Sequence, residues 1–374
     1  MSSVPAPDKI QGITPSEDLP VSVNERPASK ILHPASELRP FIIPIFIPHA
    51  GCPHRCVFCN QRVLTGAKTK IPSAAAVRRQ IADFLIYKRI HRSFTEVAYF
   101  GGNFLGLNTV DIELLLYEAG GFVQTGQVDG IRFSTRPDTI DLTRLDLINP
   151  YPVSTIELGV QSMDDQVLSM ARRGHSAADT IKAMDLLKNR NYQIGMQIMI
   201  GLPGDSPQKS LVTAKKIAAL QPDFVRIYPT VVLEHSFLAQ MYRQGEYSPP
   251  SLASSVSLAK TLFLYFKQKN IAVVRMGLQA AEDLDSGGAI LAGPYHPAFG
   301  HLVYSEIFLD TAKKMLDRRG SNSGSVTIKV HPRSLSRMKG LKNQNIATLK
   351  RDYNIRSITI TPDSSLSTDT VILD

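Results

Sequence analysis

Cysteine is scarce in this sequence, and long apolar runs are absent from it. Only three cysteines occur among the 374 residues, and unpaired cysteines in such a number are typical of a reducing compartment. The most apolar segment, residues 41–47, is short and contains Pro44, so it is too short to span a membrane. The N-terminus also lacks a basic-then-apolar signal pattern. We therefore expect a cytoplasmic protein without a membrane partner.

Acidic residues are outnumbered by basic ones. The chain carries 42 Lys and Arg against 33 Asp and Glu, for a formal net charge of +9. This excess suggests an anionic partner, although composition alone does not identify it. An apolar content of 43% with 20% charged residues is ordinary for a globular protein with a sizeable core. The length suits one large domain with an appendage, or two domains.

All three cysteines lie within one short segment. Cys52, Cys56 and Cys59 follow a C-x3-C-x2-C spacing, which can wrap three corners of a [4Fe–4S] cluster. Because the chain supplies no fourth cysteine, one iron would be left open for a ligand. A zinc site completed by His49 or His54 is the first alternative. Three inert buried thiols are the second, and the polar, loop-like residues between the cysteines argue against it.

Strands and helices are predicted to alternate from residue 41 onward. Residues 1–40 are rich in Pro, Ser and charged positions, so we expect a loosely attached N-terminal tail. Ser176 and Asp179 form a predicted capping box at the start of one helix. Apolar, β-branched runs predict strands at residues 42–47, 97–100, 131–134, 155–160, 193–200, 223–228 and 271–275. This pattern predicts an α/β fold, a partial or full TIM-like βα barrel, with ligands at the carboxyl ends of its strands.

Polar residues occupy one face of several predicted strands. Alternation places Glu157, Gly159 and Gln161 on one side of the strand at 155–160, and Gln197 and Arg226 occupy similar positions on the next two strands. If the aliphatic faces pack on helices, the barrel interior is polar and partly hollow, which suits a cofactor and a substrate. The alternative is that these polar residues pair with one another in a filled barrel.

A glycine pair ends the predicted strand at 97–100. Gly101 and Gly102 lack a Cβ, so the backbone there can approach a ligand closely, and the Asn103 side chain that follows can accept a hydrogen bond. Taken alone, such a pair is more often a simple turn.

Taken together, the cysteine run, the glycine pair and five further segments resemble the radical S-adenosylmethionine (radical SAM) superfamily. These segments are Ser134-Thr-Arg-Pro-Asp138, Glu157-Leu-Gly-Val-Gln161-Ser, Arg173-Gly-His175, Gly201-Leu-Pro-Gly204 and Arg226-Ile-Tyr-Pro-Thr230. The likeness is to the radical SAM half of the Elongator catalytic subunit and, more distantly, to oxygen-independent coproporphyrinogen oxidase. No segment here has room for the acetyltransferase domain of the Elongator subunit, so its complete activity is not expected of this chain.

The resemblance implies a [4Fe–4S] cluster held by the three cysteines, with S-adenosylmethionine bound to the open iron. It also implies an electron donor similar to flavodoxin or ferredoxin. Cofactor-binding roles are implied for Phe58 near the adenine, for Gly101, Gly102 and Asn103 near the methionine amino group, and for Gln161, Arg173 and Gln197 along the pocket. Arg173 is the expected partner of the cofactor carboxylate. Without the resemblance, Arg172 and Arg173 would be expected as a solvated pair after a helix, and no residue is identified for hydrogen transfer.

The C-terminal segment differs in character from the rest. We expect a radical SAM core at residues 41–235, a C-terminal extension at 236–318, and a small basic α+β unit at 319–374. Between Lys313 and Arg356 the many Lys and Arg residues face only Asp317 and Asp352. The segment around Met338–Leu349 looks like the loop and helix of a KH-type RNA-binding fold, with Asn343 where its second glycine should be. A solvated basic surface is the alternative.

These observations favour a radical SAM enzyme that generates a 5′-deoxyadenosyl radical, acting on RNA such as tRNA. Two alternatives stay open: an RNA-binding protein whose metal site is structural, and a porphyrin-directed radical SAM oxidase.

Overall fold

The computed structural model describes residues 40–47, 51–60, 71–87, 94–278, 288–319 and 324–374. The N-terminal tail expected at residues 1–40 lies outside this range except for Pro40. His49, one candidate fourth zinc ligand, lies outside it as well.

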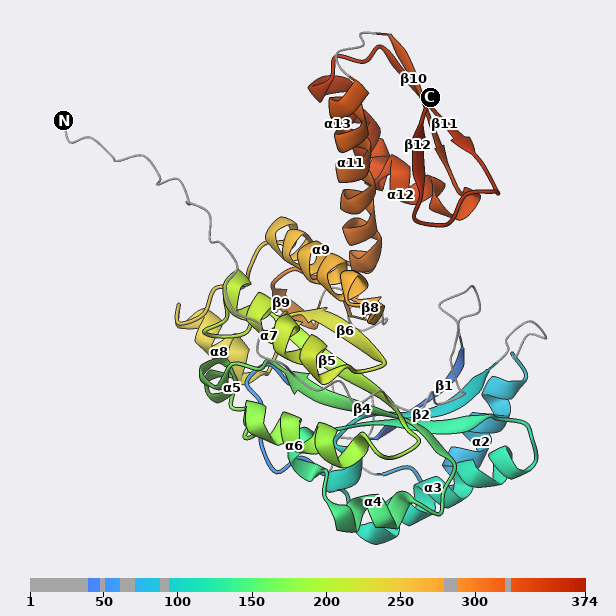
Figure 1. The fold of residues 1–374 in the computed structure, drawn as a ribbon. Helices are drawn as coiled ribbons and strands as arrows, with labels where there is room; N and C mark the ends of the chain where they lie inside the picture. The colour runs from blue at the N-terminus through green and yellow to red at the C-terminus, as the bar shows by residue number, and fades with distance from the viewer. Residues whose placement is uncertain (1–39, 48–50, 61–70, 88–93, 279–287, 320–323) are drawn as a thin grey trace, which may run out of the picture. The chain divides into compact units, whose positions relative to one another are not determined.

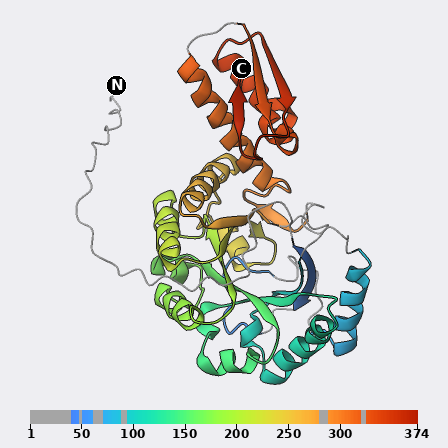
Figure 2. The same ribbon diagram turned by 45° about the vertical axis from the view of Figure 1, so that its right-hand side comes forward.

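A seven-stranded parallel sheet forms the centre of the fold (Figure 1). Its strands lie in the order β1 (Phe41–Ile47), β2 (Thr95–Gly101), β3 (Gly130–Thr135), β4 (Val153–Gln161), β5 (Gln193–Ile200), β6 (Phe224–Pro229) and β8 (Ala272–Met276). Neighbouring strands all pair in parallel, and the sheet curls within a ring of helices (Figure 2). The predicted partial βα barrel is thereby confirmed.

Helices between the strands cover the outer face of this sheet (Figures 1 and 2). They are α2 (Ala74–Leu85), α3 (Thr109–Gln124), α4 (Leu142–Ile148), α6 (Ala177–Leu187), α7 (Pro207–Leu220) and α9 (Leu252–Gln268). Each buries apolar residues against the aliphatic face of the strands, for example Ile81 of α2 and Ile45 of β1. The capping box predicted at the start of α6 is present, with the Ser176 and Asp179 side chains and backbones reciprocally bonded.

Two short helices, α5 (Asp165–Met170) and α8 (Phe237–Arg243), pack on the segment that carries the cysteines. Val57 of that segment shares an apolar cluster with Val167 of α5 and Leu238 of α8. The Leu238 amide also donates to the Val57 carbonyl at 2.8 Å. A two-stranded antiparallel ribbon of β7 (Val232–Leu233) and β9 (Ile290–Ala292) adjoins this region. The cysteine segment is therefore anchored to the barrel on its apolar side.

Helix α11 (Phe299–Arg319) contributes to two hydrophobic cores. Its first half, with Phe299 and Val303, belongs to the barrel core, and its second half, with Phe308 and Leu316, belongs to a smaller core near the C-terminus. The elements of that second core are β10 (Ser325–Val330), α12 (Leu335–Lys339), α13 (Gln344–Asp352), β11 (Ser357–Pro362) and β12 (Val371–Leu373). Strand β10 lies between β11, which is parallel to it, and β12, which is antiparallel. The unit is α+β as expected, while its KH-type character stays a prediction.

Within the described residues, no helix combines the length and apolarity that a membrane span requires.

Candidate functional site

The three cysteines lie on one loop that follows the carboxyl end of β1. None of the three forms a disulfide bond; Cys56 is buried, and Cys52 and Cys59 are partly exposed. Burial raises the pKa of the Cys52 thiol, and the nearby positive charge of Arg173 opposes that rise. In the part of the chain that the structure describes, no three His, Cys, Asp or Glu side chains converge into a ready metal site.

Close backbone packing holds the start of this loop against the carboxyl end of β2. Gly51 has a φ of +75°, a conformation that side chains disfavour. A Cβ on Gly51 would overlap the Asn103 carbonyl oxygen, and one on Gly106 would overlap the Gly51 carbonyl. The absence of a Cβ at both positions therefore lets the cysteine loop lie directly on the 103–107 backbone.

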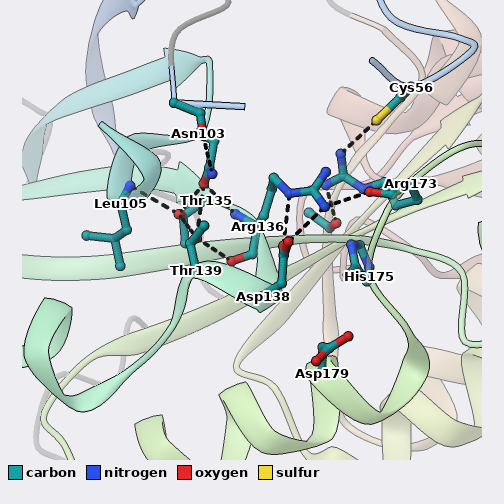
Figure 3. A network of polar contacts seen from close by, with 12 residues as sticks. Cys56, Asn103, Leu105, Thr135, Arg136, Asp138, Thr139, Arg173, His175 and Asp179 are labelled. Atoms are coloured by element: carbon teal, nitrogen blue, oxygen red, sulfur yellow. Dashed lines mark hydrogen bonds and ion pairs between the residues drawn. The ribbon is translucent and has the colours of Figure 1, made fainter. Parts of the chain in front are cut away.

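The Asn103 side chain connects the cysteine loop to β3 (Figure 3). Asn103 is fully buried, and its Nδ2 donates to the Gly51 carbonyl at 2.8 Å. Its Oδ1 accepts from Thr135 Oγ1 at 2.7 Å, from the Arg136 amide at 3.0 Å and from Thr139 Oγ1 at 3.1 Å. Both ends of the amide are thus already engaged in positioning the loop. The cofactor-binding role expected for Asn103 stays a prediction.

Two buried arginines approach the cysteine loop from the other side (Figure 3). Arg173 Nη1 donates to Cys56 Sγ at 3.3 Å, and its Nη2 donates to the Gly159 carbonyl at 2.6 Å. Arg136 Nη2 donates to the Arg173 carbonyl at 2.6 Å, and its guanidinium forms a bidentate pair with Asp138. Arg136 is 2% exposed and Arg173 is 8% exposed. The expectation of a solvated pair at 172–173 is therefore wrong for Arg173, although Arg172 is exposed and stacks on Phe237.

His175 and His54 shape the same corner of the site. Burial, together with the positive charges of Arg173 and Arg136, lowers the pKa of His175 to about 3, so its ring is neutral at physiological pH. Its Nε2 lies 3.3 Å from the Val160 carbonyl and can donate to it, which leaves Nδ1 as an acceptor. The His54 ring fills the space where a Cβ of Gly174 would lie. Both histidines thus have local packing roles.

The other predicted cofactor residues also lie at or near the carboxyl ends of the strands. Gly101 ends β2 with a φ of +106°, and Gly102 follows it. Gln161 ends β4 with a φ of +67°, which is uncommon for a residue with a side chain and typical of functional sites. Phe58 packs on the apolar cluster around Val57. The cofactor roles of these residues stay predictions.

Deeper in the barrel, polar side chains form a network of buried ion pairs around Glu157. Its carboxylate accepts from Arg226 at 2.7 and 2.9 Å, from Arg132 at 3.2 Å and from Gln197 Nε2 at 3.0 Å. Arg132 also contacts Glu96 at 2.7 Å. The alternative that these polar residues pair with one another therefore holds for Glu157, Arg226 and Gln197. At this level the paired side chains occupy part of the interior that the sequence predicts to be hollow, and the cofactor role expected for Gln197 stays a prediction.

The sequence analysis assigns no role to Arg136. It lies in the Ser134–Asp138 segment that carries part of the resemblance, but sequence alone does not show that its guanidinium reaches Arg173 across the sheet. The available signal was its position just after a strand and before Pro137 and Asp138. Functional groups of a parallel sheet lie at the carboxyl ends of its strands.

The donor set and its surroundings suit an iron–sulfur cluster with an anionic ligand beside it. Soft thiolates are the ligands that such clusters require. Three buried polar atoms near Cys56 lack hydrogen-bond partners among the described residues, namely Arg173 Nε, Arg136 Nη1 and His175 Nδ1. Buried polar groups are normally paired, so unpaired N–H groups on two arginines indicate that a polar, anionic group can be accepted here.

Comparison with protein families identifies the class of this protein. Residues 46–217 match the radical SAM superfamily, and residues 222–308 match the radical SAM C-terminal domain. The chain belongs to the radical SAM superfamily, whose enzymes use a [4Fe–4S] cluster and S-adenosylmethionine.

Two curated relatives each match just over half of this chain. An uncharacterized protein of Methanocaldococcus jannaschii is 32% identical over 220 residues, covering 55% of this chain and 66% of that protein. A tRNA uridine(34) acetyltransferase of Dehalococcoides mccartyi is 26% identical over 230 residues, covering 53% of this chain and 50% of that protein. The chain therefore spans half to two thirds of the length of these two relatives.

A solved structure shows the same fold. The archaeal Elp3 of Methanocaldococcus infernus, with residues 1–46 deleted, superimposes with a TM-score of 0.58 at 22% identity. The superposition covers 75% of this chain and 64% of that one. The likeness to the radical SAM half of the Elongator subunit is confirmed.

Proposed function

We propose that this protein cleaves S-adenosylmethionine reductively and modifies an RNA substrate similar to tRNA. When bound, the cluster would supply the electron for reductive cleavage of S-adenosylmethionine, and the cleaved cofactor would remove a hydrogen atom from the substrate. The residues of the chain itself would bind and orient the cluster and the cofactor. Cys52, Cys56 and Cys59 would hold the cluster, and the spare N–H groups of Arg173 and Arg136 would receive the methionine carboxylate.

One observation carries this proposal. Three cysteines that form no disulfide lie on one loop at the carboxyl edge of a curled parallel sheet, beside a buried arginine with an unpaired N–H. Gly101, Gly102, Gln161 and Phe58 would complete the cofactor pocket, by resemblance.

An anaerobic turnover assay tests the proposal. The protein is reconstituted with iron and sulfide, reduced with dithionite in place of its flavodoxin- or ferredoxin-like donor, and mixed with S-adenosylmethionine. We expect 5′-deoxyadenosine and methionine in equal amounts. A filled cluster without cleavage would contradict the proposal, and zinc without sulfide in the purified protein would favour a structural metal site.

The RNA part of the proposal is supported by charge and by the name of a relative. The Dehalococcoides relative is a tRNA uridine(34) acetyltransferase. Some basic side chains of the C-terminal unit form ion pairs with acidic side chains of the same unit, for example Lys329 with Asp374. Two lysines of the turn between α12 and α13, Lys339 and Lys342, are exposed. Gly340 opens that turn with a φ of +72°, so the turn presents backbone as well as charge. Phosphate groups are the natural ligand of such a surface.

Salt-dependent binding of an unmodified tRNA transcript checks this part. Because each phosphate contact releases counterions, affinity should fall steeply as salt rises. Replacing Lys339 and Lys342 together by alanine should lower the slope of log affinity against log salt by about 2. The control removes two exposed lysines from barrel helices, Lys182 and Lys215, and should leave the slope unchanged. An affinity that does not depend on salt, or an equal decrease in slope in both double variants, would contradict RNA binding at Lys339 and Lys342.

A further inference from the structure

Arg173 differs from the other buried arginines of the site in its partners. Arg136 is neutralised by Asp138, and Arg132 and Arg226 by Glu157. Among the described residues Arg173 has no carboxylate partner, and its donors reach a thiol and a backbone carbonyl instead. An uncompensated buried charge is costly unless something else balances it. The group that its Nη1 faces is the sulfur of Cys56, at 3.3 Å.

The position of this guanidinium is fixed from several sides (Figure 3). Its Nη2 donates to the Gly159 carbonyl at 2.6 Å, and a Cβ on Gly159 would lie only 2.7 Å from that same nitrogen. The Arg173 carbonyl accepts from Arg136 at 2.6 Å. Two residues earlier, the Ala171 carbonyl accepts from the Val57 amide at 3.1 Å, next to Cys56. The segment that carries Arg173 therefore also binds the cysteine loop, and this contact holds the guanidinium beside the Cys56 thiol.

We infer that Arg173 sets the reduction potential of the cluster through its hydrogen bond to Cys56 Sγ. This inference rests on the proposed function, since it requires a cluster on the three cysteines. Net charge and hydrogen bonds to the ligand sulfurs are among the factors that set cluster potentials. The reduced cluster carries one more negative charge than the oxidised one, so a fixed N–H and a positive charge stabilise it more. Burial strengthens this effect because the local dielectric constant is low.

Arg173 is thus a positioning and tuning residue for Cys56, in addition to the carboxylate contact implied by the family resemblance. Its Nη1 faces the thiol, while its Nε–H is unpaired among the described residues and stays available for a ligand. One guanidinium can serve both groups, because it presents five N–H donors in a rigid fork.

Redox titration of the reconstituted protein, monitored by electron paramagnetic resonance without S-adenosylmethionine, tests the inference. For Arg173→Gln we expect the equilibrium constant for one-electron reduction to fall about tenfold, since hydrogen bonds to charged groups are among the stronger ones. A tenfold change corresponds to a potential about 59 mV more negative. Arg173→Lys, which keeps the charge and loses the fork, should lie between Arg173→Gln and wild type. The matched control is Arg172→Gln, which removes an exposed guanidinium one residue away and should match wild type.

A labelled wild-type sample covers the case in which the Arg173 variants fail to fold. Protein carrying ¹⁵N-arginine should show a weak ¹⁵N coupling to the reduced cluster in pulsed spectra, and Arg172→Gln should retain it. No coupling in wild type, or an unchanged potential in Arg173→Gln, would overturn the inference while the proposed function stands. Failure of wild type to assemble any cluster would instead overturn the proposed function.

Discussion

Replacing Cys56 by alanine is expected to abolish formation of 5′-deoxyadenosine. A cluster held by three thiolates has no spare protein ligand, so the loss of one leaves two irons without a protein sulfur. The described residues offer no third His, Cys, Asp or Glu side chain in place to substitute. Bound iron and sulfide should therefore fall together with turnover in the Cys56→Ala variant, and likewise in Cys52→Ala and Cys59→Ala. Iron analysis and the anaerobic turnover assay measure both quantities.

The matched control for the cysteine variants is Arg55→Ala. Arg55 lies between two of the cysteines on the same loop and is exposed, so its removal alters the loop without touching a thiol. We expect it to retain iron and sulfide at the wild-type level. A Cys56→Ala protein that keeps a full complement of iron and sulfide, or keeps its turnover, would show that the cluster is held elsewhere.

Replacing Glu157 by glutamine is expected to destabilise the barrel by about 3–5 kcal/mol, the usual cost of removing one partner of a buried ion pair. The Glu157 side chain is fully buried between Arg132 and Arg226. Arg132 would retain Glu96, but Arg226 has no second carboxylate among the described residues. The change would therefore leave the largely buried Arg226 guanidinium without a counter-charge. Urea unfolding of the protein without its cluster measures the loss, with exposed Glu113→Gln as the control.

The same substitution predicts a pH dependence. Burial alone would raise the pKa of Glu157, but Arg226 and Arg132 outweigh burial and hold that pKa below its ordinary value. A carboxyl whose pKa is lower in the folded state stabilises the fold at pH values above its unfolded pKa, and this stabilisation is lost as the pH falls through the folded pKa. The stability difference between wild type and Glu157→Gln should thus be full at pH 7 and shrink below about pH 4. A difference that is constant with pH, or under about 1 kcal/mol at pH 7, would contradict this role.

Much of the fold could be predicted because its signals are local. Each strand of the main sheet shows an apolar, β-branched run within a few residues, and the Ser176–Asp179 capping box marks the start of a helix. The alternation of these elements leads to a parallel barrel, since parallel strands need helical crossovers. The α+β character of the small C-terminal unit could be predicted too, and the structure places two of its strands at Ser325–Val330 and Ser357–Pro362 and a helix at Gln344–Asp352.

The site could be predicted only in part. The cysteine spacing is a local signal, and it identifies the loop. By contrast, the burial of Arg173 could not be read from a neighbourhood that looks like a solvated helix end, because its partners Cys56 and Gly159 come from distant segments. The hydrogen bonds of the Asn103 amide to Gly51 and to the end of β3 also join segments far apart in the sequence, and its expected cofactor role stays a prediction.

By itself, the sequence determined which chemistry this protein can host. Three cysteines at a fixed spacing, without a fourth in the sequence, predict a site for an incompletely ligated cluster. The tertiary structure alone decided how the charges of the site are balanced. Strand register brings Glu157 between Arg132 and Arg226, and the loop after α5 brings Arg173 to Cys56. Such pairings depend on segments far apart in the chain that meet only when the sheet closes, so no local pattern records them.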